Sequence, residues 1–158
     1  MEIASQIKEK LGDNWLPLIY REKIRSLRTR SFRLDVAEHE NRVEIQHTLL
    51  GVELKVGNKR LSCPDLSTAR YLQVFGRLGC AEIAVPYDIT KISTLADELE
   101  SSWQRTLLLL DDAAHEKSAS ARGRLRSGLM KEIRRELAEI GAGEKMPQFK
   151  QTTKQRGS

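Results

Sequence analysis

The chain has 158 residues, of which 39% are hydrophobic and 31% charged, with a formal net charge of +5 and a pI of ≈ 9.4. This length lets one domain bury a core without disulfide or metal support. The longest aliphatic run, residues 107–110, is far shorter than the ~20 apolar residues of a membrane helix. The first ten residues lack the apolar core of a signal peptide. We therefore expect a cytoplasmic protein without a membrane partner.

Residues 2–27 predict two amphipathic helices. Ile3, Ile7 and Leu11 recur every four residues until Gly12, which is typical of a helix that buries one side. Pro17 suits the first turn of a second helix. That helix would place Leu16, Tyr20, Ile24 and Leu27 on one side, and Arg21, Arg25 and Arg28 on another.

From residue 31 the apolar residues alternate with polar ones, which predicts half-buried antiparallel strands. Alternation covers residues 31–37, 42–50 and 51–56, and a further strand follows at 59–63. Gly57-Asn58 is a two-residue hairpin signal, and the slip in alternation at Gly51 predicts a bulge or tight turn. The centre of the chain therefore predicts a three- or four-stranded meander.

The remaining segments predict helices around this sheet. A helix over residues 65–78 has Asp65 as its cap and Gly79 as its stop. A short strand at 81–87 precedes amphipathic helices over 92–110 and 125–140. The predicted fold is α+β or mixed α/β: a small antiparallel meander plus a further strand, covered by amphipathic helices. Residues 1–142 would form one domain, and residues 143–158 a disordered basic tail.

The two cysteines flank the helix predicted over 65–78. A straight helix of that length would hold Cys63 and Cys80 near 20 Å apart, beyond the ~7 Å that a disulfide tolerates. We predict two free thiols. Neither cysteine has the neighbours of a zinc site.

Three charged residues of the predicted strands could form a catalytic site. Glu53 and Lys55 lie two apart on a strand and so project from the same face. If the strand of Asp35 lies close by, its carboxylate could converge with that of Glu53. Two carboxylates suit Mg²⁺, and a neighbouring lysine could orient a metal-bound water or stabilise developing phosphorane charge.

This arrangement resembles the PD-(D/E)XK (restriction-endonuclease-like) nuclease superfamily over about residues 17–86. The shared order is helix, strand with "LD", strand, strand with "ELK", helix, strand. The resemblance implies that Asp35 and Glu53 bind Mg²⁺ and that Lys55 is the catalytic lysine of a metal-dependent phosphodiesterase. Leu34 stands where the family has proline before the aspartate, and the strand at 59–63 is an insertion. The alternative interpretation is that all three residues belong to the solvated face of an ordinary sheet.

Basic residues gather in two segments of the chain, residues 21–30 and 117–135. Arginine pairs bidentately with phosphate, so both segments suit a polyanion. They could equally be solvated helix faces, or a seam that pairs with the acidic helix over 97–116. The candidate nucleic-acid-binding residues are Arg21, Arg25, Arg28, Arg30, Arg122, Arg124, Arg126, Lys131, Arg134 and Arg135.

Two functions follow as hypotheses. The first is a non-catalytic binding or assembly protein, without a cofactor, that engages nucleic acid or an acidic protein surface through these arginine-rich segments. The second is the Mg²⁺-dependent nuclease with Asp35, Glu53 and Lys55. The apolar stripes of residues 92–110 and 125–140 could also mediate homodimerisation.

Overall fold

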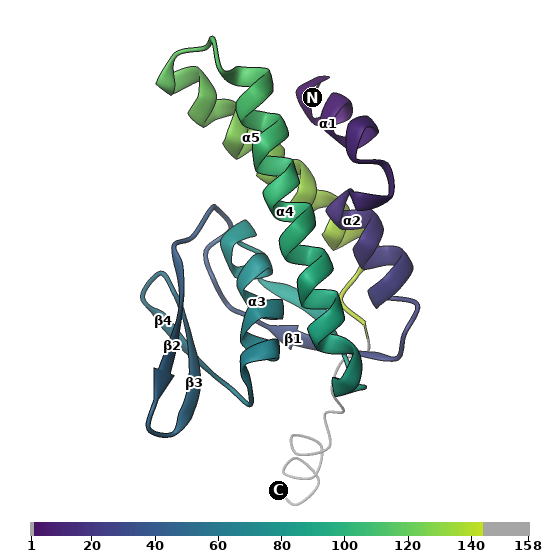
Figure 1. The fold of residues 1–158 in the computed structure, drawn as a ribbon, viewed down its shortest axis with the longest axis vertical. Coiled ribbons are helices and arrows are strands. Elements are labelled where there is room, and N and C mark those ends of the chain that lie inside the picture. Colours follow the sequence, from purple (N-terminus) through teal and green to yellow (C-terminus); the bar gives the residue numbers. More distant parts are fainter. Residues whose placement is uncertain (1, 144–158) are drawn as a thin grey trace, which may run out of the picture.

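The computed structural model describes residues 2–143 and confirms the mixed α+β class (Figure 1). Helix α1 (Glu2–Leu11), the short helix η1 (Gly12–Asn14) and α2 (Leu16–Ile19) open the chain. The helix predicted after Pro17 changes at Tyr20 into a π-helical turn, η2 (Tyr20–Ile24). Its wider turn is closed by the N–H of Arg25, which donates to the carbonyl oxygen of Tyr20 at 2.8 Å.

The meander consists of β2 (Val43–Thr48), β3 (Gly51–Val56) and β4 (Lys59–Cys63), in that order. Gly57 adopts a left-handed φ of 60° in the predicted turn, and Thr48 pairs with Gly51 across a two-residue loop. The tight turn predicted at Gly51 is therefore confirmed.

Helix α3 (Leu66–Leu78) covers one face of the meander. The Asp65 carboxylate accepts the N–H of Thr68 at 2.7 Å and caps the helix as predicted. Gly76 allows close packing, because a Cβ atom there would lie 3.2 Å from Val56.

The strand predicted over residues 31–37 is wrong in its extent and its partner. β1 (Thr29–Arg33) ends before Asp35, and it pairs antiparallel with β5 (Glu82–Pro86) in a separate sheet. Asp35 turns the chain with a φ of 52°, a left-handed conformation that aspartate tolerates better than most residues. The N–H groups of Leu34 and Asp35 both donate to the carbonyl oxygen of Ala81. The regular pattern of hydrogen bonds between β1 and β5 therefore ends at Arg33.

Helices α4 (Ile92–Ala114) and α5 (Ala119–Ile140) complete the fold, after the short helix η3 (Ile89–Lys91). α4 begins at the predicted residue but continues to Ala114, and α5 begins at Ala119, earlier than predicted, but ends at the predicted residue. α4 packs on α3, α1 and α2, while α5 crosses behind it (Figure 1). The described residues share one core cluster, in which every long helix takes part. The predicted tail lies outside the described residues apart from Gly143. None of the described helices is long and apolar enough to cross a membrane.

Strand β5 has a strand neighbour on one edge, and tyrosine hydroxyl groups bind its other edge. The Ala84 N–H donates to the Tyr20 hydroxyl oxygen at 2.8 Å, and the Tyr71 hydroxyl donates to the Ala84 carbonyl oxygen at 2.6 Å. Tyr20 in turn donates to the Gly141 carbonyl oxygen at 2.7 Å. Both rings contact Phe75, with centroids 5.8 and 5.4 Å away. These bonds join η2, α3, β5 and the end of α5.

Replacing Tyr20 with phenylalanine tests this junction. The Ala84 N–H and the Gly141 carbonyl would lose their buried partner, which costs about 1–3 kcal/mol of unfolding free energy. Burial also raises the pKa of Tyr20 to about 12, against ~10 in an unfolded chain. The unfolded chain therefore binds fewer protons between those pH values, and stability falls as pH rises through them. Urea denaturation should show a lower midpoint for Tyr20→Phe and a weaker alkaline decline; an unchanged midpoint would contradict the junction.

Gly79 offers a second test, at the end of α3. Its φ is 81°, and a Cβ atom there would lie 2.3 Å from the carbonyl oxygen of His39. Gly79→Ala should lower the free energy of unfolding by more than about 1–2 kcal/mol, because it adds a backbone clash to left-handed strain. Gly123→Ala is the matched control: Gly123 lies in α5 with nothing near its Cβ position, so helix propensity should make it neutral or stabilising by up to about 1 kcal/mol. Equal losses for both would contradict this account.

Candidate anion-binding groove

The three predicted catalytic residues lie in two different places. The carboxylate of Asp35 lies 3.3 Å from Arg33 and 3.6 Å from Lys59. Glu53 pairs with Arg60 across β3 and β4 at 3.1 Å. Lys59 is opposite Val56, whose side chain is buried under α3, whereas Glu53 is on the alternate face.

The ion pairs of Asp35 and Glu53 therefore lie on opposite faces of the meander. Lys55 shares the outer face with Glu53, opposite Glu44 and Arg60, in the pattern of a solvated face. Within residues 2–143, no group of three or more His, Cys, Asp or Glu side chains could hold a metal ion.

The predicted nucleic-acid-binding residues separate into several locations. Arg28 lies over the ring of Tyr87 and Arg30 over that of Phe32, at 4.7 and 5.4 Å. Arg126 forms a bidentate pair with Glu40. The other members near the start and middle of α5 are Arg122, Arg124, Lys131 and Arg134.

Three of the predicted arginines meet at one groove. Arg21 and Arg25 come from η2 and its end, and Arg135 comes from the last third of α5. Arg135 is more than 100 positions from the other two in the sequence, and the three arginines line a cavity of about 670 Å³ together with Lys8 of α1. The rest of the lining is Ser26, Glu136, Glu139 and Ile140. We call this cavity the arginine groove.

A smaller hollow of about 350 Å³ adjoins the arginine groove, since both are lined by Lys8, Arg21, Glu136 and Ile140. Its floor includes Trp15, whose indole N–H donates to Glu136 at 2.9 Å. Glu136 also pairs with Lys8 at 3.4 Å. The Glu136 carboxylate therefore bonds to two donors and links Trp15 and Lys8 to α5.

The exposed arginines of the groove differ in how firmly they are held. Arg21 pairs with its neighbour Glu22 at 3.2 Å, and both side chains are about 60% exposed. Such an exposed pair contributes only about 0–1 kcal/mol, so an anion can replace it at little cost. Arg135 is held more firmly, by a bidentate pair with Glu132 and a further bond to Glu139 on its own helix.

Arg25 differs because part of its guanidinium is buried. Its Nη1 donates to the Thr29 hydroxyl at 2.8 Å, but its buried Nε has no hydrogen-bond partner among the described residues. A buried donor without an acceptor is unfavourable. Because Nε is buried, a ligand in the groove can reach Arg25 only through the other nitrogens of its guanidinium.

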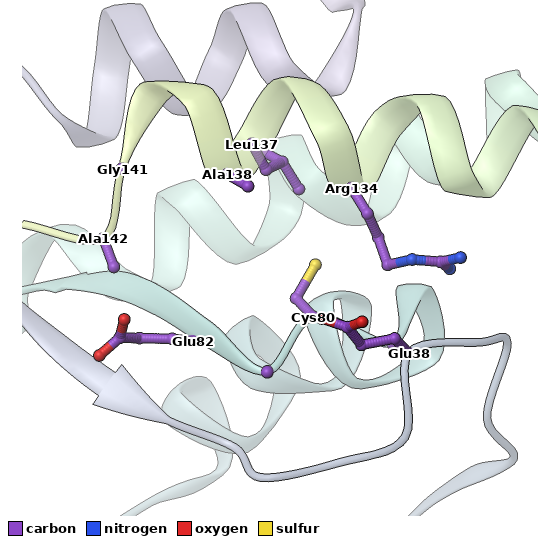
Figure 2. Close-up of a pocket in the computed structure, with 10 residues that line it drawn as sticks. Glu38, Cys80, Glu82, Arg134, Leu137, Ala138, Gly141 and Ala142 are labelled. Carbon is purple, nitrogen blue, oxygen red and sulfur yellow. The ribbon is translucent and has the colours of Figure 1, made fainter.

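A separate cavity, of about 300 Å³, surrounds Cys80 (Figure 2). The thiol points into it below α5, with Glu38 and Arg134 to one side and Glu82 to the other. Arg134 donates to the Leu78 carbonyl oxygen at 2.6 Å. Burial raises the pKa of Cys80 to about 12 although Arg134 opposes the shift, so the thiol stays protonated at neutral pH and is a poor nucleophile. Cys63 and Cys80 are both free and buried, as predicted.

The stripes predicted to mediate homodimerisation lie in the core of the single chain. In α4 and α5 the buried residues include Leu99, Trp103, Ile133 and Leu137. The acidic helix has basic partners from other elements. Lys23 of the first basic segment, residues 21–30, pairs with Glu98, as the seam interpretation expects. Arg70, which lies outside both basic segments, pairs with Asp97 and Glu100. Homodimerisation itself stays a prediction.

Sequence reasoning missed Lys8, Trp15 and Glu136 as parts of the site. Lys8 is one charge among several on α1, and Trp15 follows it seven residues later, directly after η1. Their convergence depends on how α1 packs against α5, for which the sequence carries no local signal. Comparison of the chain with protein-family models, curated proteins and solved structures finds no match.

Proposed function

We propose that this protein is a non-catalytic nucleic-acid-binding protein that holds phosphate groups in the arginine groove. The observation that carries the proposal is the convergence of Arg21, Arg25 and Arg135, from two distant segments of the chain, around one cavity. Guanidinium groups bind phosphate oxygens bidentately and are the usual donors to a nucleic-acid backbone. The net charge of +5 adds long-range attraction for a polyanion.

The lining of the groove favours nucleic acid over an acidic protein surface. Stable protein interfaces depend on aromatic or aliphatic anchors in desolvated pockets. In this groove Ile140 is the apolar member of an otherwise charged and polar lining. Such a surface suits phosphate contacts, which position a backbone without reading its sequence.

Binding of labelled single-stranded and duplex oligonucleotides, followed by fluorescence anisotropy at several salt concentrations, tests the proposal. We expect affinity to fall steeply with salt because phosphate contacts release counterions. Arg21→Gln, Arg25→Gln and Arg135→Gln should each weaken binding and lower the slope of log affinity against log salt by about one.

Arg124→Gln is the matched control on the same helix. Arg124 lies about 16 Å along α5 from Arg135 and contacts Ser120 rather than the groove. Its loss should leave affinity nearly unchanged. Absence of nucleic-acid binding, or an equal loss in the control, would contradict the proposal; the first result would leave an acidic protein as the ligand to test.

The non-catalytic part of the proposal has its own test. Since Glu53 is paired with Arg60, and Asp35 with Arg33 and Lys59, we expect DNA and RNA to remain intact after incubation with the protein and Mg²⁺ or Mn²⁺. Gel electrophoresis of the nucleic acid gives the readout. Cleavage that disappears in Lys55→Ala would instead favour the PD-(D/E)XK interpretation.

A further inference from the structure

The turn between β2 and β3 exposes two adjacent leucines. Leu49 and Leu50 form the two-residue loop between the paired residues Thr48 and Gly51, with relative exposures of 105% and 100%. The surrounding stretch, residues 45–52, contains no Asp, Glu, Lys or Arg. An uncharged, fully exposed aliphatic tip is unfavourable in water and is typical of an interaction site.

Other exposed apolar residues lie toward the same end of the molecule. Cys63 pairs with Val52 next to the tip, and α3 begins three residues later at the exposed Leu66. α4 runs beside α3 in the same direction, because successive turns of the two helices are bonded in the same order, Arg70 to Asp97 and Gln73 to Glu100. The segment that precedes α4 therefore lies at this end too, and it carries Ile89, which is 72% exposed. Figure 1 shows the β2–β3 turn and the starts of α3 and α4 toward one end of the long axis.

Two basic residues and two helix starts near this end can face an anionic surface. Arg28 lies over the ring of the partly exposed Tyr87, and Lys91 precedes α4. The acids Asp65 and Asp88 at this end keep their negative charge, and each accepts a hydrogen bond from a backbone N–H group. Two parallel helices also direct the positive ends of their dipoles here.

The sequence that follows the described residues is rich in basic residues. Gly143 lies against Thr29, which is paired with Pro86 at the end of β5. In the sequence, the next fifteen residues include Lys145, Lys150, Lys154 and Arg156. Basic residues attached to a protein near a membrane contribute to its attraction for anionic lipids.

We propose that this end of the molecule binds the surface of an anionic phospholipid bilayer, with Leu49 and Leu50 inserted into the acyl-chain boundary. A two-residue tip cannot provide the ~800 Å² per partner of a stable protein interface. A bilayer, in contrast, can receive several separated apolar projections at once, with aromatic and basic residues at the headgroup level. The expectation of no membrane partner was based on the lack of a spanning segment, and surface attachment needs none.

Sedimentation of the full chain with vesicles tests this proposal. The protein should bind vesicles of phosphatidylcholine mixed with phosphatidylglycerol more strongly than vesicles of phosphatidylcholine alone. Leu49→Ser combined with Leu50→Ser should lower the partition coefficient by at least about tenfold, since each inserted leucine contributes tenfold or more. The tip is fully exposed, so this variant should keep the thermal unfolding midpoint of the wild type.

Leu108→Ser is the matched control, because Leu108 is a 69% exposed leucine about 24 Å along α4 from its start. It should bind vesicles as the wild type does. The arginine-groove variants should also keep vesicle binding, while the tip variant keeps nucleic-acid binding, so the two proposals fail separately. If the protein binds neither kind of vesicle, the proposal is overturned, and a protein partner for the tip becomes the alternative to test. Equal losses of vesicle binding in the tip and Leu108 variants would also overturn it.

Discussion

The hydroxyl group of Tyr20 fixes the arrangement on which the rest of the molecule depends. It accepts the N–H of Ala84 and donates to the carbonyl oxygen of Gly141, while Tyr71 satisfies the carbonyl of Ala84. β5 belongs to a sheet of two strands, and such a pair alone is marginally stable in water. The two tyrosines replace the missing strand on its second edge, where buried backbone groups would otherwise be unpaired.

The same hydroxyl determines where the arginine groove can form. Because Tyr20 begins the π-helical turn and binds the residue just after α5, it holds the segment of Arg21 and Arg25 against the last turns of that helix. Glu136 of α5 bonds to Lys8 of α1 and to Trp15, which follows η1, and so joins the start of the chain to the same side of the groove. The groove and the leucine tip are built on different elements, since the tip belongs to the meander that packs on α3. The molecule therefore presents a basic groove and an apolar end that can act independently.

The sequence predicts the local elements well and the long-range contacts poorly. Asp65 and Gly79 mark the ends of α3 because capping depends on neighbouring residues alone. Alternation places Leu54 in the core and Glu53 outside it. Alternation cannot say which strand pairs with which, so the strand of Asp35 was assigned to the meander although it pairs with β5. Both arginine-rich segments were predicted to bind anions, but the meeting of Arg25 with Arg135 depends on packing more than 100 residues apart in sequence.

The central claim is that Arg21, Arg25 and Arg135 together bind a phosphate group in the arginine groove. Arginine side-chain N–H resonances, recorded by NMR during titration with an unlabelled oligonucleotide, test it most directly, because they report on each guanidinium separately. The account predicts that the signals of Arg21, Arg25 and Arg135 move most. Movement confined to Arg122, Arg124 and Arg126, with Arg25 unchanged, would contradict it.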